Sequence, residues 1–335
     1  MSGAPLLSVR EARVGFFTAR GPLRAVDGVS FDLEKGQTLG IVGESGSGKS
    51  VLVRSLIGLV GESSGAEVGG QVLFEGRDLR ALPAREFRGV LGRDIGVVFQ
   101  DPMTSLNPVM KIGHQIGEGL RLNRGLDARA AAARAVELLT EVGIPEAERR
   151  AGQYPHELSG GMRQRVAIAI AIACAPKLLI ADEPTTALDV TVQRQILDLL
   201  QREQRERGMA MILITHDLGV AAGRADDIMV MYAGRAVETA KTRELFRSPR
   251  MPYTEALLRS LPRLTDPTHT RLSAIPGRPP DLARRSGGCA FAPRCRYRTD
   301  RCDEEQPMQT WEGARGYACF HPRGVDVGGS GGAAE

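Results

Sequence analysis

The run Gly43-Glu44-Ser45-Gly46-Ser47-Gly48-Lys49-Ser50 has the residue types and spacing of a phosphate-binding loop, G-x-x-x-x-G-K-[ST]. Glycines let the backbone turn successive N–H groups toward phosphate oxygens. Lys49 is expected to reach the β- and γ-phosphates of a nucleotide, and the Ser50 hydroxyl to bind Mg²⁺. The alternative is an ordinary glycine-rich turn that happens to precede a lysine.

The segments on either side favour the phosphate loop. Residues 38–42 are mostly apolar and suit a buried strand, and residues 51–57 read as the apolar start of a helix. Strand, glycine loop and helix form the context in which this motif binds phosphate, because the helix start adds its own unpaired N–H groups. The sequence therefore predicts a nucleotide site built from Gly43, Ser45, Gly46, Gly48, Lys49 and Ser50.

A pair of acids follows a second apolar run. Residues 178–181 are continuously apolar and lead directly into Asp182 and Glu183. An aspartate at the end of a buried strand can bind Mg²⁺ through water, and the glutamate beside it can polarise an attacking water. A solvated acidic pair at a strand end is the other interpretation, and the pair alone does not decide between them.

A third segment, Leu158-Ser159-Gly160-Gly161-Met162, precedes Arg163-Gln164-Arg165 and the apolar residues 166–175. A serine and glycines at the start of a helix again form an anion site. The segment resembles the signature sequence of ATP-binding-cassette (ABC) ATPases, and the resemblance covers residues 6–245. It implies ATP as the ligand and a head-to-tail pair of subunits, in which Ser159, Gly160 and Gly161 of one subunit cap the γ-phosphate held by the other.

The resemblance also implies roles for residues outside these three segments. Gln100 would bind Mg²⁺ together with Ser50 and Asp182 and relay contact with membrane subunits. His216 would hydrogen-bond the γ-phosphate and orient the catalytic Glu183. The remaining implied residues are Asp189, in the Ala187-Leu188-Asp189 loop that couples the two sites, and Phe16, which would stack on adenine with Phe17 as a close competitor.

A finer resemblance is to the ATPase subunits of oligopeptide/dipeptide (peptide/nickel) importers. It rests on the phosphate loop, on residues 99–108, on Tyr154-Pro155-His156-Glu157, on Ser248-Pro249 and Pro252-Tyr253-Thr254, and on Ile275-Pro276-Gly277. It implies ATP hydrolysis that powers import of a peptide or similar solute through two separate permease subunits. An extracytoplasmic solute-binding protein would take part indirectly, and the second ATPase subunit could be identical or different.

This interpretation places the chain at the cytoplasmic face of the membrane as a peripheral subunit. The alternative is a soluble ABC ATPase that acts on ribosomes or DNA, a class that usually carries two cassettes or a coiled-coil insertion; neither is present here. The transported substrate cannot be read from this chain, since recognition is expected on the solute-binding protein and the permease.

Four late cysteines have the spacing C-x5-C-x6-C-x16-C, namely Cys289, Cys295, Cys302 and Cys319. None of the gaps is the C-x2-C of a zinc finger. Four thiolates suit a [4Fe–4S] cluster or Zn²⁺, and the surrounding residues resemble an importer extension in which some members hold an iron–sulfur cluster. We expect a structural cluster ahead of zinc, and both ahead of a disulfide pair; four unligated thiols remain open. Cys174 is expected in the core.

The elements that must position these residues alternate between strands and helices, which predicts an α/β fold with a mostly parallel sheet. Further strands are expected at 6–17, 29–33, 71–75, 95–99, 211–215 and 228–232, and helices at 112–142, 166–175 and 192–207, with a polar loop at 61–70. The predicted organisation is an ABC ATPase core at 6–245 with an antiparallel β edge and a helical subdomain at about 101–165. A small C-terminal extension at 246–325, expected to have little core of its own, and a flexible tail at 326–335 complete it.

Composition limits the other possibilities. The net charge of +4 over 335 residues is too weak and dispersed for a nucleic-acid groove. The longest apolar run, residues 166–175, is ten residues long, whereas a membrane span needs about 20. No signal peptide is expected at the start, and five cysteines in a cytoplasmic chain favour thiols or a metal site.

Overall fold

The computed structural model describes residues 4–19, 21–61, 65–101, 105–186, 188–261, 275–283 and 287–324. The chain forms two compact units. Unit 1 comprises Met1–Leu7, Asp32–Thr38 and Leu73–Ile214, and unit 2 comprises Ser8–Phe31, Leu39–Val72 and Thr215–Glu335. The expected tail at 326–335 lies outside the described residues.

Parallel strands form the centre of unit 1. β6 (Ile95–Val98) pairs with β7 (Leu178–Asp182), which pairs with β8 (Ala210–Thr215). Every residue of β7 and β8 is buried, as expected for parallel strands that are covered on both faces. In the β6–β7 register Val98 lies opposite Ala181, so the residues that follow the two strands emerge at the same edge.

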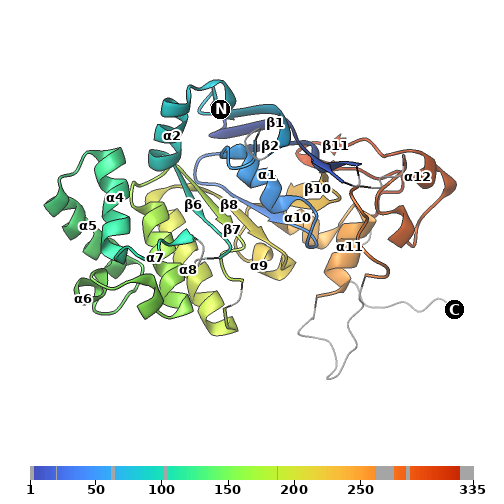
Figure 1. Ribbon diagram of the computed structural model, residues 1–335. Helices are drawn as coiled ribbons and strands as arrows, with labels where there is room; N and C mark the ends of the chain where they lie inside the picture. The colour runs from blue at the N-terminus through green and yellow to red at the C-terminus, as the bar shows by residue number, and fades with distance from the viewer. Residues whose placement is uncertain are drawn as a thin grey trace. The chain divides into compact units, whose positions relative to one another are not determined.

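The α-helices described in unit 1 are α2 (Ala84–Arg93), α4 (Ile112–Arg124), α5 (Ala128–Glu141), α6 (Ala147–Ala151), α7 (Gly160–Ile172) and α8 (Val190–Arg207). Figure 1 shows α4, α5 and α6 gathered beside α7 at the left. Leu138 and Leu139 of α5 are fully buried, and Asp127 caps this helix by accepting a hydrogen bond from Ala130 N.

Unit 2 contains the glycine loop between two of its elements. β3 (Thr38–Val42) pairs in parallel with β9 (Asp227–Tyr232), and β10 (Arg235–Lys241) is antiparallel to β9. The short strands β12 (Arg315–Tyr317) and β11 (Thr310–Glu312) extend this ladder.

The other elements of unit 2 lie around this ladder. The strands β2 (Gly21–Leu33), β1 (Leu7–Thr18) and β4 (Ala66–Phe74) are neighbours in a second sheet. The last two residues of β4, Leu73 and Phe74, belong to unit 1 and pair antiparallel with β5 (Arg77–Asp78) of the same unit. The helices of unit 2 are α1 (Lys49–Leu56), α9 (Leu218–Ala222), α10 (Thr242–Arg247), α11 (Pro252–Arg259) and α12 (Asp300–Glu304).

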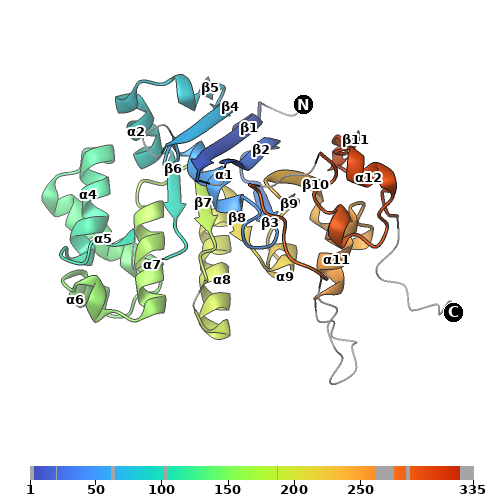
Figure 2. The same ribbon diagram turned by 45° about the vertical axis from the view of Figure 1, so that its right-hand side comes forward.

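The C-terminal extension shares the core of unit 2, which corrects the expectation that it has little core of its own. Met251, Tyr253 and Leu258 of the α11 segment, together with Phe291, are buried in one cluster with Val230 of β9. Figure 2 shows α11 and the cysteine-bearing segment near α12 next to each other. The buried apolar residues of the extension are few and widely spaced along the sequence, so no periodic pattern predicts that they are buried.

A buried carboxylate also connects the extension to β10. Glu238 is fully buried and accepts hydrogen bonds from Arg250 N and Met251 N, at 2.8 and 2.9 Å, and from the Arg315 guanidinium at 2.7 Å. A buried charge with this many donors is well compensated. The extension is therefore held to β10 by polar as well as apolar contacts.

Several element bounds differ from the sequence prediction. The segment 61–70 is not wholly a loop, because β4 begins at Ala66, and α7 begins at Gly160 and ends at Ile172 instead of spanning 166–175. The predicted helix at 112–142 is two helices separated at Gly125, whose positive φ of 68° ends α4. Within the described residues, no helix is long and apolar enough to cross a bilayer.

Candidate nucleotide-binding residues

The glycine loop of unit 2 has the backbone shape that its sequence predicts. Gly48 caps α1 with φ 100°, and a Cβ placed there would lie 2.3 Å from the Ala25 carbonyl oxygen. Only glycine fits such a position, because φ is left-handed and the neighbouring backbone is too close. Gly43 is similarly confined, since its Cβ would lie 2.2 Å from Met231 O of β9.

Lys49 lies folded over this loop. Its side chain is buried, and Nζ donates to Gly43 O at 2.8 Å and to Glu44 O at 3.1 Å. The ammonium group is thus stabilised by two loop carbonyls and lies at the point where an anion above the loop would meet it. Ser50, the next residue of α1, is half-buried.

Unit 1 brings Gln100 and Glu183 together. Val98 of β6 lies opposite Ala181 of β7, and Gln100 and Glu183 each follow two residues later on their own strand. Gln100 Nε2 donates a hydrogen bond to Glu183 Oε2 at 3.3 Å. Thr186 Oγ1 donates to the same oxygen at 3.1 Å. Asp182 ends β7 and is 1% exposed, so its carboxylate is almost completely removed from solvent.

The backbone of Glu183 is strained. Its φ is +47°, a left-handed conformation that a residue with a Cβ rarely adopts, and its N–H donates to Ile214 O of β8 at 3.1 Å. The chain leaves β7 here and turns sharply, which directs the Glu183 side chain toward Gln100. A strained residue that is held by its neighbours is frequent at reactive sites.

The signature segment caps α7. Ser159 is the N-cap residue and accepts from Met162 N at 3.4 Å, and Ser159 and Gly160 are both exposed. A Cβ on Gly161 would lie 2.8 Å from Val192 Cγ1 of α8, so the close packing of α7 against α8 requires a glycine at this position. The helix start of α7 is therefore open to solvent on the side of Ser159 and Gly160.

The remaining predicted residues occupy the ends of elements. Asp189 caps α8 and accepts from Val192 N at 2.9 Å, a structural role that the sequence analysis did not assign. His216 directly follows β8 and is exposed. Phe16 is half-buried near the end of β1, whereas Phe17 is 71% exposed. Ala187 and residues 102–104 lie outside the described residues.

The four late cysteines line one small cavity of unit 2 together with Met251, Phe291 and His321. All are free thiols, so the disulfide alternative is wrong for this structure. Three of the sulfurs accept a hydrogen bond from the N–H two residues further along the chain, from Phe291 to Cys289, from Tyr297 to Cys295 and from His321 to Cys319.

Burial keeps three of these cysteines in the thiol form at neutral pH. It raises the pKa of Cys289 and Cys295, and it raises the pKa of Cys319 to about 11. Within the parts of the chain that the structure describes, no group of three or more His, Cys, Asp or Glu side chains is arranged to hold a metal ion. Cys174 is 5% exposed in the core of unit 1, as predicted.

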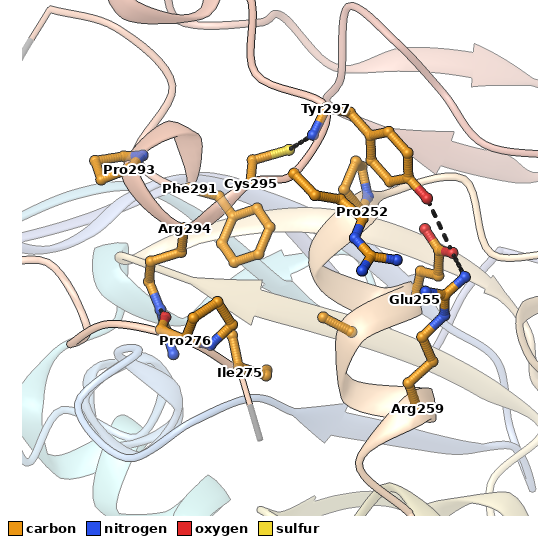
Figure 3. Close-up of a pocket in the computed structure, with 12 residues that line it drawn as sticks. Pro252, Glu255, Arg259, Ile275, Pro276, Phe291, Pro293, Arg294, Cys295 and Tyr297 are labelled. Carbon is orange, nitrogen blue, oxygen red and sulfur yellow. Dashed lines mark hydrogen bonds and ion pairs between the residues drawn. The ribbon is translucent and has the colours of Figure 1, made fainter. Parts of the chain in front are cut away.

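Contacts to the glycine loop from the extension were missed by the sequence analysis. Glu44 N donates to the Tyr253 hydroxyl at 2.9 Å, and the Glu44 carboxylate forms an ion pair with Arg294. Tyr253 belongs to a segment that the sequence analysis singled out, but without a role. The contact of Arg294 with Glu44 cannot be predicted from the sequence, because the two residues are 250 positions apart. Arg294, Phe291 and Cys295 line a cavity of about 390 Å³. Figure 3 shows these residues of the extension close together.

Comparison with known proteins identifies the family. The ABC transporter family profile matches residues 26–186, and the profile of the oligopeptide/dipeptide transporter C-terminal region matches residues 237–302. A putative peptide import ATP-binding protein of Brucella melitensis is 52% identical over 317 residues, which span 92% of this chain and 94% of the relative.

The chain belongs to the ABC transporter family. The oligopeptide transport ATP-binding protein OppD of Salmonella typhimurium is 49% identical and covers 95% of this chain and 94% of its own length. Among solved ABC structures, the ATP-binding cassette MJ0796, a dimer bound to ADP and Pi, aligns with a TM-score of 0.63 at 28% identity over 71% of this chain and 99% of its own. The structure of cbiO1 from Clostridium perfringens aligns with a TM-score of 0.60 at 29% identity, over 73% of this chain and 91% of its own.

The fold and family inferred from the sequence are thus confirmed: an ABC ATPase cassette that carries the C-terminal region of oligopeptide/dipeptide transporters.

The geometry of the glycine loop gives a prediction for stability in the absence of nucleotide. Gly48→Ala should lower the free energy of unfolding by about 3 kcal/mol, because it combines backbone strain with a clash against Ala25 O. Gly46→Ala is the matched control: Gly46 has φ 78° and nothing within 4 Å of the place that a methyl group would take, so only about 1 kcal/mol of strain is expected. Denaturant unfolding measures both free energies, and equal decreases in the two variants would contradict the steric role of the Ala25 carbonyl at Gly48.

Proposed function

We propose that this chain is an ATP-hydrolysing subunit that powers import of peptides or a similar solute through separate membrane permease subunits. Similarity to peptide import ATP-binding proteins over more than nine-tenths of the chain, including the C-terminal region, supports the substrate class. The same similarity favours an importer over a soluble ABC ATPase that acts on ribosomes or DNA.

The roles of individual residues follow from their chemistry. When ATP binds, the Lys49 ammonium group leaves its hydrogen bonds to the two loop carbonyls and pairs with the β- and γ-phosphates. The N–H groups of the glycine loop donate to phosphate oxygens. Phe16 stacks on adenine. Ser50, Gln100 and Asp182 supply the oxygen ligands that Mg²⁺ prefers, and the bound ion would neutralise phosphate charge.

Glu183 is the residue on which hydrolysis depends. Gln100 and Thr186 both donate to Oε2 of its carboxylate, so the group is held in place where it can accept a proton from the attacking water. This held carboxylate, next to the buried Asp182, is the observation in the structure that carries the proposal. His216 hydrogen-bonds the γ-phosphate and orients Glu183.

The exposed signature segment supports action as a pair of subunits. Ser159, Gly160 and Gly161 present an anion-binding helix start to a second ABC ATPase subunit, identical or related, and Asp189 lies in the loop that would couple the two sites. The pair would act with two permease subunits at the cytoplasmic face of the membrane and, indirectly, with an extracytoplasmic solute-binding protein. We assign the cassette to residues 6–245 and the extension to 246–325.

Two substitutions should separate binding from hydrolysis. Glu183→Gln keeps the size and hydrogen bonds of the side chain but removes the base, so ATP binding should persist while turnover falls at least about 100-fold. Lys49→Ala should weaken ATP binding itself. Binding of a fluorescent ATP analogue and phosphate release in the assembled complex measure the two effects, and wild-type turnover in Glu183→Gln would refute the catalytic role.

For the extension we propose a [4Fe–4S] cluster held by Cys289, Cys295, Cys302 and Cys319, with Zn²⁺ as the alternative metal. The four thiols line one cavity, and three of them accept N–H···S hydrogen bonds, which would stabilise the thiolates that bind metal. Within the described part of the chain they are not arranged to hold an ion, so binding of the cluster would have to draw them together. The cluster would connect segments that are far apart in the sequence, a structural and not a catalytic role.

Anaerobically purified protein should therefore be brown and contain iron and acid-labile sulfide in equal amounts. Serine substitution of any of the four should lose the iron, because each supplies one ligand, whereas Cys174→Ser in the core of unit 1 should retain it. Colourless protein with stoichiometric zinc would establish the alternative metal, and protein with neither metal would refute both.

A further inference from the structure

Arg294 is a buried arginine of the extension, and each of its three side-chain nitrogens donates at least one hydrogen bond. Its side chain is 4% exposed, and its two terminal nitrogens donate to the two Glu44 carboxylate oxygens at 2.6 and 2.9 Å. One of them also donates to the Tyr232 hydroxyl at 3.2 Å, and Nε donates to Pro276 O at 2.8 Å. Such a two-bond pair fixes both the distance and the angle between the groups.

Aromatic rings hold the guanidinium in place. Tyr232, Tyr253 and Phe291 pack against one another with ring centres 4.5 to 5.4 Å apart, and the Arg294 guanidinium carbon lies 5.9 Å from the centre of Tyr232 and 6.0 Å from that of Phe291. Figure 3 shows Arg294 and Phe291 projecting from one turn, with Arg294 beside Pro276. The Arg294 guanidinium therefore has aromatic neighbours on the extension and β9 in addition to its pairing with Glu44.

Glu44 is in turn held at every polar group. Its carboxylate meets Arg294, its N–H donates to Tyr253, and its carbonyl accepts from Lys49. The pKa of Arg294 is raised, chiefly by the hydrogen bonds to the Glu44 carboxylate, so the guanidinium stays charged. Glu44 is the second residue of a loop with glycines at 43, 46 and 48, and such a loop has few contacts of its own to fix its shape.

We propose that Arg294 is a positioning residue for nucleotide binding, which holds the glycine loop in its phosphate-binding shape through Glu44. Without this anchor the loop has to be ordered when ATP binds, and the cost appears as weaker binding. The extension is on this account part of the nucleotide site and not only an appendage. The inference rests on the proposed function of the loop as the ATP site.

A purely structural role of the pair would give a different result. If Arg294 only fastened the extension, its loss would lower the melting temperature and leave ATP affinity unchanged. The two accounts are separated by measuring nucleotide affinity, the KM and kcat of ATP hydrolysis, and melting temperature on the same variants.

The test uses the full chain assembled with its partner subunits and a fluorescent ATP analogue as the probe. Arg294→Gln and Glu44→Gln should each raise the dissociation constant and the KM about tenfold, with kcat at saturating ATP within about twofold of wild type. The double variant should be no weaker than either single one, because both remove the same interaction. Arg294→Lys should recover part of the affinity, since lysine keeps the charge but not the two-bond geometry.

Arg298→Gln is the matched control, since Arg298 belongs to the same extension and pairs with Asp303 at the surface. It should leave affinity unchanged. If Arg294→Gln does not fold, Glu44→Gln decides alone, because it preserves side-chain size and leaves the extension intact. Dissociation constants within about twofold of wild type in these variants, with a lower melting temperature, would overturn the inference.

The outcome is distinguishable from a failure of the proposed function. ATP binding that is lost in Lys49→Ala but unchanged in Arg294→Gln and Glu44→Gln would refute the positioning role alone. Wild-type protein that binds no ATP would refute the proposed function and this inference with it.

Discussion

A loop that is to bind phosphate through its backbone cannot spend most of its N–H groups on internal hydrogen bonds, and therefore depends on its surroundings for its shape. In this protein the surroundings are supplied by several elements of unit 2. Gly234 N donates to Ser47 O at 2.9 Å, and the carbonyls of Ala25 and Met231 lie so close to Gly48 and Gly43 that no side chain fits there. The loop is shaped from outside, by β2, β9 and the turn after β9.

The extension completes this outer support. Tyr253 and Arg294 reach Glu44 from two segments of the extension, and the rings of Tyr232, Tyr253 and Phe291 fill the space between them. Arg294 also directly precedes Cys295, one of the four thiols that share a cavity. The glycine loop and the cysteine-bearing turn thus both contact the cluster formed by Tyr253, Phe291 and Arg294, and these shared contacts help to keep the extension ordered.

Much of the site could be predicted from the sequence where a short motif determines local geometry. The glycine loop and the acids at the end of β7 each depend on neighbours in the chain, and each lies where its pattern predicts. The hydrogen bond between Gln100 and Glu183 depends on the parallel register of β6 and β7, and the register cannot be read from the sequence. The Arg294–Glu44 pair and the buried Glu238 depend on tertiary packing alone, and the start of β4 at Ala66 was masked by a glycine-rich composition.

Uptake of labelled peptide into proteoliposomes tests the central claim most directly, with the permease subunits, both ATPase subunits and the solute-binding protein present. If this chain powers import, peptide should accumulate only when hydrolysable ATP is supplied on the side that carries the ATPase subunits, and peptide should stimulate phosphate release there. Equal accumulation with a non-hydrolysable ATP analogue, or peptide uptake that is independent of nucleotide, would contradict the account.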